Sequence, residues 1–421
     1  MGTIADVRPA VDDAGLSLYN LLDPEVLDNP YPLYARLRSE DPVHWDPFLH
    51  AWVVTRYDDV VQVLHKFIAN RTPTPELLEA MGAPELSEIA EVMVKQMLFM
   101  DAAAHTRIRQ LASYAFTPAR IKVLRDHIES IAERLVSEME AKGSFDLIGD
   151  FAAPLPAIVT AEMLGVPTSD YRQLKDWSFT FSEMLGNFQH NPDRSEAVLE
   201  ALRGMIKYFR NAIAVQKEYP TEGLVRSFMD AEADGDRFTE EEIVANCILT
   251  MVGGLETTTN LIGSGILTLM RHRDQYERLC QDPSLIPGAV EELLRFESPS
   301  QHTARLAPAD IEMGGKLIKE RQAVIAVMGA ANRDPERFPN PDELDFTRSP
   351  NRHVAFGWGA HFCFGAALAR MEAHIAYGLL TSRFPNLRRE NDAPVEWRDN
   401  LGLRGLKELR MNSGKEGGLP A

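Results

Sequence analysis

The sequence predicts a mostly helical protein with a small β region. Long stretches carry apolar residues at helical spacing and end in helix-capping residues, and the longest of them runs from about 239 to 272. One early stretch, 43–55, instead reads as two short strands joined by a turn, as in a β-hairpin. Of the 421 residues, 45% are hydrophobic, which is enough for a large core, although length alone allows two or three domains.

The N-terminal part of the chain supplies short helices around this hairpin. A helix over 32–39 has proline in its first turn, and a second helix is expected over 57–66. Residues 67–101 follow no regular pattern and are rich in Met and other apolar residues. On its own, that composition favours ordinary core packing, for which the flexible methionine side chain is well suited.

Two long helices have clear ends. The first, over 117–143, begins with Thr-Pro and ends with glycine, the expected order of capping residues. Several shorter helical segments follow it. The second begins at Thr239, which forms a capping box with Glu242, and extends to about His272. Apolar residues surround much of this second helix, so we expect it to be buried.

The middle of the longest predicted helix contains residues that are unfavourable in a buried helix. Gly253 and Gly254 together cost about 2 kcal/mol relative to alanine, and Glu256 would place a carboxylate in a buried position. Such residues inside a strong helix indicate a functional site. The glycines leave room for a ligand, and the Thr257 hydroxyl can bond back to the Gly253 carbonyl and open the helix locally.

Composition excludes several classes of function. The formal net charge is −18, which argues against nucleic acid as a general partner. No run of eighteen apolar residues occurs, and residues 1–30 lack the apolar core of a signal peptide, so we expect a cytoplasmic protein. Cys247, Cys280 and Cys363 are far apart, and no Cys-x-x-Cys pair is present, so a zinc site or a disulfide framework is not expected.

Cys363 stands in an apolar, glycine-rich loop that leads directly into a helix. Gly357, Gly359 and Gly365 permit turns that a side chain would block, and helix-favouring residues begin at Ala366. Free N–H groups and the helix dipole stabilise a thiolate at such a position. A lone cysteine in apolar surroundings is usually a small core residue. The leading functional alternative is an axial ligand to haem iron.

The motif around Cys363 favours the second alternative. It reads Phe356-x-x-Gly359-x-x-x-Cys363-x-Gly365, with His361 two residues before the cysteine and Leu368-Ala369-Arg370 after it. This pattern closely resembles the haem-ligand loop of the cytochrome P450 family. The resemblance extends over about 30–410 and implies a triangular, mostly α fold with a long central helix over the haem. It implies one domain over 1–421, with an N-terminal extension at 1–29 and a C-terminal tail region at 390–421. Because the tail from Arg389 is polar and ends in glycine-rich residues, we expect it to be frayed.

The resemblance also implies roles for individual residues. Cys363 would ligate the iron of haem b, while Glu256 and Thr257, in the Gly-Gly-x-Glu-Thr-Thr segment, would relay protons to bound dioxygen. The haem propionates would be held by His105, Arg109, Arg305 and His361, with His353 as a weaker candidate. A triad that supports the cysteine loop would consist of Glu292, Arg295 and Arg333.

A member of this family would use O2 and NAD(P)H-derived electrons to oxygenate an apolar small molecule. We expect the electrons to come from a separate ferredoxin (or flavodoxin) and its reductase, and the protein to be a monomer with no membrane partner. The basic residues Arg120, Lys122 and Arg125 would form part of the docking face, although a solvent-exposed helix face is the alternative for Lys122 and Arg125 individually. Terpenoids, steroids, fatty acids and polyketides all fit the Met-rich and Phe-rich variable segments, as is typical of secondary metabolism.

Further residues and alternative functions stay open at this point. Residues expected near the substrate channel are Phe179, Phe181, Met184, Leu185 and Phe188, for which plain helix packing is an equal alternative. The rival functions are a haem-thiolate peroxygenase, a non-catalytic haem protein that binds a ligand, and a helical protein without a cofactor. The acid–threonine pair argues against the peroxygenase, because peroxide-driven members of the family typically replace it.

Overall fold

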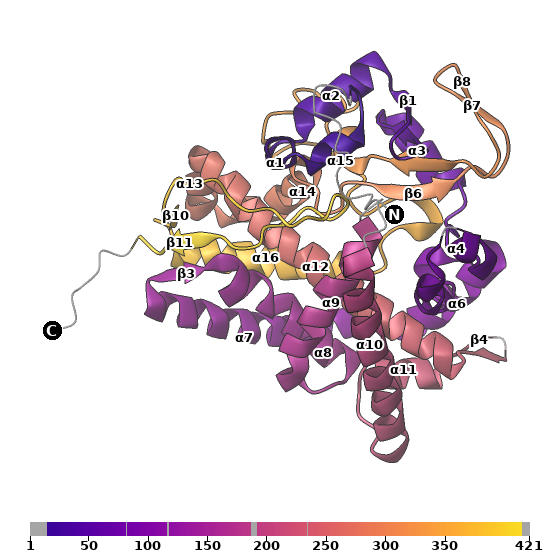
Figure 1. Cartoon of the computed structure of the whole chain (residues 1–421). Helices are drawn as coiled ribbons and strands as arrows, with labels where there is room; N and C mark the ends of the chain where they lie inside the picture. Colours follow the sequence, from indigo (N-terminus) through magenta and orange to yellow (C-terminus); the bar gives the residue numbers. More distant parts are fainter. Residues whose placement is uncertain (1–14, 81, 116–117, 187–191, 234, 415–421) are drawn as a thin grey trace.

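The computed structural model describes residues 15–80, 82–115, 118–186, 192–233 and 235–414. The predicted class is confirmed, since helices dominate and strands form small sheets (Figure 1). The first helices are α1 Pro24–Asp28, α2 Tyr31–Glu40, α3 Tyr57–Lys66, α4 Pro75–Ala80, α5 Ser87–Met93, α6 Ala102–Ala115, α7 Pro118–Lys142 and α8 Pro154–Leu164. They are followed by α9 Tyr171–Gly186, α10 Pro192–Glu218, α11 Leu224–Asp230, α12 Glu240–Arg271, α13 Arg273–Gln281, α14 Ile286–Phe296, α15 Met328–Ala331 and α16 Ala366–Arg383.

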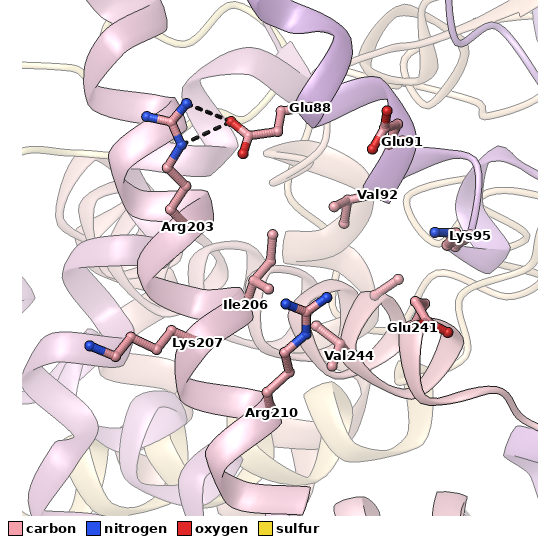
Figure 2. A pocket seen from close by; sticks show the side chains of 11 residues that line it. Glu88, Glu91, Val92, Lys95, Arg203, Ile206, Lys207, Arg210, Glu241 and Val244 are labelled. Atoms are coloured by element: carbon pink, nitrogen blue, oxygen red, sulfur yellow. Dashed lines mark hydrogen bonds and ion pairs between the residues drawn. The ribbon is translucent and has the colours of Figure 1, made fainter.

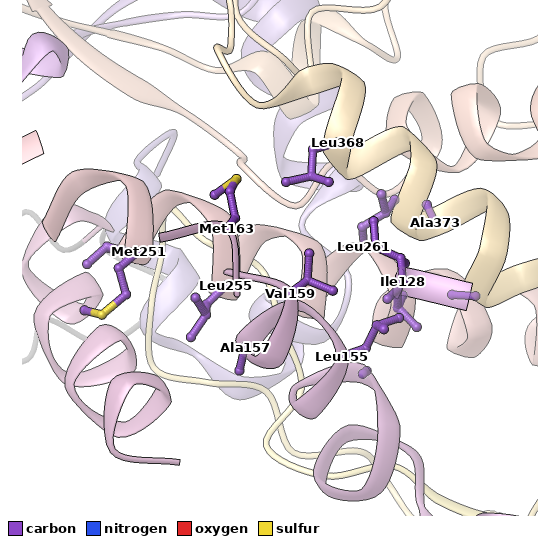
Figure 3. Packing of buried hydrophobic residues seen from close by; sticks show 14 of the residues in the cluster. Ile128, Leu155, Ala157, Val159, Met163, Met251, Leu255, Leu261, Leu368 and Ala373 are labelled. Atoms are coloured by element: carbon purple, nitrogen blue, oxygen red, sulfur yellow. The ribbon is translucent and has the colours of Figure 1, made fainter. Parts of the chain in front are cut away.

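The helix α12 is the centre of the core. It has 32 residues, which makes it about 48 Å long, and the predicted capping box between Thr239 and Glu242 is present at its start. It packs against α8, α9, α10 and α16. Figure 3 shows side chains of α12, among them Leu255 and Leu261, between residues of α8 and of α16. Because helices cover it on several sides, α12 buries most of its residues, as predicted.

The β region combines two distant parts of the chain. The predicted hairpin is present as β1 Val43–Asp46 and β2 Ala51–Val54. The strand β2 pairs in parallel with β9 Ala323–Ala326, which pairs antiparallel with β6 Thr303–Leu306, giving the order β1-β2-β9-β6. Other small sheets contain β3 Ser144–Asp146 with β10 Arg388–Arg389 and β11 Arg410–Asn412, β4 Glu232–Ala233 with β5 Asp236–Arg237, and β7 Ile311–Met313 with β8 Lys316–Ile318.

The expectation of a frayed C-terminal tail is wrong for the residues that the structure describes there. The strand β11 pairs with β3, so the end of the chain closes a sheet begun near residue 144. Trp397, Leu406 and Met411 are buried in the main core. The apolar residues that anchor this segment are not recognisable in its mostly polar sequence, because they are spaced irregularly and do not form one run.

Among the described residues, no helix is both long and apolar enough to cross a membrane.

Candidate cofactor and active site

The loop that carries Cys363 is fixed by backbone geometry. Gly357 and Gly359 adopt φ angles of +72° and +70°, a left-handed conformation that strongly favours glycine. The Cys363 N–H donates to the Phe356 carbonyl oxygen at 2.8 Å, which closes the loop. The helix α16 begins at Ala366, so Cys363 lies just before a helix N-terminus, as predicted from the sequence.

The surroundings of the Cys363 thiol act in opposite directions. Burial raises its pKa, while the Gly365 backbone N–H and the guanidinium groups of Arg109 and Arg370 favour the thiolate. Arg109 also donates from Nη2 to the carbonyl oxygen of Phe362 at 2.8 Å, which ties α6 to the loop. Burial has the largest effect, so the pKa of the thiol is raised above its ordinary value, and a metal ion bound to the sulfur would favour the thiolate.

The structure brings together the four residues predicted to hold propionates, although they come from α6, β6 and the cysteine loop. The ring centroids of His105 and His361 are 4.2 Å apart. Burial, then the nearby His105 and Arg305, lower the pKa of His361 to about 4. Burial and the neighbouring Arg109 also lower the pKa of His105. The low pKa values follow from burial and from the crowding of basic groups.

Arg71 also belongs to this cluster and was not predicted from the sequence. Burial first, and then the nearby Arg305, lower the pKa of Arg71 to about 9. Its guanidinium lies 4.7 Å from the Phe99 ring centroid and donates from Nη1 to the Ala69 carbonyl at 3.1 Å. The segment 67–101, for which the sequence predicted no regular structure, contains α4 and α5. Nothing in its sequence distinguishes Arg71 from a surface residue, because the burial of Arg71 depends on the packing of distant parts of the chain.

Among the residues that the structure describes, the basic cluster lacks matching acids and has buried polar atoms without partners. Asp101 lies close to it, but its carboxylate already accepts the backbone N–H groups of Ala69 and Asn70. Within the described part of the chain, His105 Nε2 and Arg305 Nε are buried and have no hydrogen-bond partner. Since buried donors are normally satisfied, this site fits a ligand with two carboxylates, as the propionates of haem b provide.

The hydrogen bond predicted from Thr257 to the Gly253 carbonyl is present, but α12 remains a continuous helix there and is not opened. Thr257 Oγ1 donates to the Gly253 carbonyl oxygen at 2.8 Å. Gly253 is exposed although Val252 and Leu255 beside it are buried, and a side chain built on Gly253 would meet no atom within 4 Å. The helix therefore borders open space at this turn, and the Thr257 hydroxyl lies on the same side.

Glu256, the acidic residue that precedes Thr257, lies against α9. Glu256 is 1% exposed and accepts a hydrogen bond from Ser182 of α9. Burial raises its pKa to about 7, although Ser182, Arg398 and Asn260 act in the opposite direction. A carboxyl group with this pKa can take up and release a proton near neutral pH.

The predicted charged triad needs one correction. Glu292 and Arg295 are fully buried and form a bidentate pair at 2.7 and 2.8 Å, as expected. The third member of the triad is not Arg333 but Arg348, whose Nε lies 3.1 and 3.2 Å from the two carboxylate oxygens of Glu292. Arg333 instead donates to the Phe296 carbonyl and pairs with Asp342.

Removal of the Glu292 charge is expected to destabilise the protein strongly. The Glu292→Gln variant leaves Arg295 and Arg348 without their buried counter-charge, which costs about 3–5 kcal/mol of unfolding free energy. Urea unfolding monitored by circular dichroism measures the loss. The matched control is Glu277→Gln, which breaks an exposed pair with Arg273 and should cost under about 1 kcal/mol. Equal losses in the two variants would contradict this account.

A surface pocket of about 470 Å³ lies between α5, α10 and α12. Arg203 of α10 and Glu88 of α5 form an ion pair of 2.7 Å at its edge (Figure 2). Its lining consists of Glu88, Glu91, Val92, Lys95, Arg203, Ile206, Lys207, Arg210, Glu241, Val244 and Ala245. This mixture of charges does not suit an apolar substrate, and none of these residues belongs to the cysteine loop. We therefore treat the pocket as separate from the candidate active site.

The structure describes the surroundings of only some of the residues expected near the substrate channel, so that expectation stays a prediction. Phe181 is buried in the core, and the Arg398 guanidinium lies 4.1 Å from the Phe179 ring centroid. In the Met-rich segment, Met97 and Met100 also pack in the main core. Phe188 lies outside the described residues, and nothing is described of the side chains of Met184, Leu185, Arg120 and Lys122.

A helical fold with a cysteine loop beside a basic, buried cradle for a dicarboxylate defines the architecture of a haem-thiolate protein. Comparison with known proteins identifies the family. The cytochrome P450 family model matches residues 51–395, and the chain belongs to the cytochrome P450 family. Members of this family are monooxygenases, a class of oxidoreductase, and contain haem iron.

The similar proteins are bacterial P450 enzymes. The polyketide biosynthesis cytochrome P450 PksS of Bacillus subtilis (strain 168) is 38% identical, over 92% of this chain and 96% of that protein. The solved structure of P450BioI with an acyl carrier protein that carries hexadec-9Z-enoic acid has a TM-score of 0.86 and 36% identity, over 92% and 99% of the two chains. CYP109E1 from Bacillus megaterium in complex with corticosterone has a TM-score of 0.81 and 32% identity, over 93% and 100%.

Proposed function

We propose that this protein hydroxylates or epoxidises an apolar small molecule, using O2 and electrons delivered by a separate ferredoxin or flavodoxin and its reductase. The observation that carries the proposal is the cluster of buried basic residues beside the Cys363 loop, two of which have donor atoms without a partner among the described residues. A bound haem would satisfy the Cys363 sulfur and the basic residues at once, because it offers a metal to the sulfur and two carboxylates to the basic side chains.

Each residue has a defined task in this proposal. Cys363 binds the iron, and the haem, when bound, supplies the site that activates dioxygen. The propionates are held by His105, Arg109, Arg305 and His361, and we add Arg71 to this set. Thr257 presents a hydroxyl beside the space that Gly253 borders, and Glu256 holds an exchangeable proton one residue before it. The acid–threonine pair supports monooxygenation over a peroxide-driven reaction.

The electron donor is proposed to dock near the cysteine loop. Trp358 and Phe362 are large apolar residues of this loop, and they are 36% and 39% exposed. Exposed apolar side chains beside a redox centre favour a protein contact. The basic contribution predicted from Arg125 is reduced, because this residue pairs with Glu129 at 2.7 Å on its own helix.

The substrate is proposed to be apolar and of moderate size. The similar proteins named above are associated with polyketide biosynthesis, with a fatty acid on a carrier protein, and with corticosterone. We therefore include terpenoids, steroids, fatty acids and polyketides, either free or carrier-bound, among the candidates. A substrate of this kind would enter the space that Gly253 borders and exclude water from it.

Visible absorption spectroscopy of the purified ferric protein tests the proposal. We expect a thiolate-haem Soret band that shifts from low to high spin when one class of compound displaces water from the iron. The panel contains a steroid, a free fatty acid, its carrier-protein ester and a macrolide. A protein that acquires no Soret band even after reconstitution with haem would refute the proposal.

The pH dependence of coupling tests the role of Glu256. Its pKa of about 7 means that the protonated form predominates below neutrality and is lost as the pH rises through 7. We expect product formed per NADH consumed to fall over that range, and to become low and insensitive to pH in Glu256→Gln. The rate of haem reduction, measured separately, controls for pH effects on the donor. A parent profile that stays flat through pH 7 would contradict the assignment.

A further inference from the structure

Glu291, which no motif singled out, joins three segments on the side of α14 that faces the cysteine loop. Its two carboxylate oxygens accept a bidentate pair of hydrogen bonds from Arg370 of α16, at 2.6 and 2.8 Å. One of these oxygens also lies 3.2 Å from His353 Nε2. Because the Ala355 N–H donates a hydrogen bond to His353 Nδ1 at 3.3 Å, the ring proton of His353 is on Nε2. The Nε2–H group therefore donates a hydrogen bond to Glu291.

Both partners of Glu291 contact the residue that fixes Cys363. The Arg370 guanidinium lies 4.5 Å from the centroid of the Phe356 ring, and the His353 ring lies 6.0 Å from the same ring. The Phe356 carbonyl oxygen in turn accepts the Cys363 N–H at 2.8 Å. The contacts therefore form a continuous path from the Glu291 carboxylate to the backbone of Cys363.

Glu291 also balances a positive charge next to the sulfur. Arg370 and Arg109 are the two arginines whose charges favour the Cys363 thiolate. Arg370 is neutralised by Glu291, whereas Arg109 has no carboxylate partner among the described residues. Burial opposes ionisation of Glu291, but the hydrogen bonds from Arg370 and His353 lower its pKa to about 2, so it stays charged at neutral pH.

We propose that Glu291 is a positioning residue for the iron-binding thiolate, which holds His353 and Arg370 against the loop and limits the positive charge that Cys363 experiences. The inference rests on the proposed binding of haem iron by Cys363. A residue behind a metal ligand affects both the orientation and the electron density of that ligand. Glu292, its neighbour, serves a different cluster through Arg295 and Arg348.

The test is a comparison of reduction potentials in purified holoprotein. In Glu291→Gln the charge of Arg370 is no longer balanced, so the more negative reduced centre is stabilised and the potential shifts to a more positive value. In Arg370→Gln the unbalanced carboxylate shifts the potential in the opposite direction. The double variant Glu291→Gln/Arg370→Gln should return close to the parent value. Haem transfer to apomyoglobin should be about tenfold faster in Glu291→Gln.

The matched control is Glu277→Gln, which breaks the exposed pair with Arg273 and should leave the potential and haem transfer unchanged. A purely structural role of Glu291 would alter haem transfer but not the potential. A Glu291→Gln potential equal to that of the parent therefore overturns the inference, as do shifts of the same sign in the two single variants. A parent protein without a thiolate-haem band would instead refute the proposed function itself.

Discussion

The Cys363→Ala variant is expected to lose the thiolate-haem Soret band and all monooxygenase turnover. Alanine offers no ligand to iron, and the loop contains no other cysteine that could replace the sulfur. Arg109 and the histidines would still attract the propionates. We therefore expect the variant to bind haem weakly and without the spectrum of a thiolate ligand. The carbon monoxide difference spectrum of the reduced protein measures the loss directly.

Cys280→Ala is the matched control for this variant. Cys280 lies on α13, is partly exposed, and has Arg273 and Glu277 as its charged neighbours, away from the loop. Its removal should leave the spectrum and the turnover of the parent unchanged. If Cys363→Ala retained the band while Cys280→Ala lost it, the assignment of Cys363 as the iron ligand would be wrong.

The parts of the molecule that the sequence predicted correctly depend on short-range geometry. The capping box of Thr239 and Glu242 spans one turn, and the bond from Thr257 to Gly253 spans four residues, so spacing alone specifies both. The loop conformation at Gly357 and Gly359 is equally local.

The parts that the sequence did not predict depend on contacts between distant segments. Arg333 and Arg348 are both arginines near the end of a turn, and only the path of the chain between them decides which one reaches Glu292. Arg71 becomes part of the basic cluster because β6 brings Arg305 beside it. A long flexible side chain can serve many positions, so its partner is set by the tertiary fold and not by spacing.

The Thr257→Ala variant is expected to consume NADH at close to the parental rate while forming at least about tenfold less product. The hydroxyl faces the space beside Gly253, where a proton must reach dioxygen as it is reduced. Loss of a positioned proton donor typically costs about 10²–10⁴-fold in the step it serves, whereas electron delivery does not depend on it. The missing electrons should appear as hydrogen peroxide, which a peroxidase assay quantifies.

Two further variants separate the hydroxyl from the local shape of the helix. Thr259 makes the same kind of bond, from Oγ1 to the Leu255 carbonyl at 2.9 Å, but it is buried away from that space, so Thr259→Ala should keep the coupling of the parent. Thr257→Ser retains the hydroxyl and should recover most of the product. If Thr257→Ala coupled as well as Thr259→Ala, the space beside Gly253 would serve only to make room for a ligand, and proton delivery would have to be assigned to other groups.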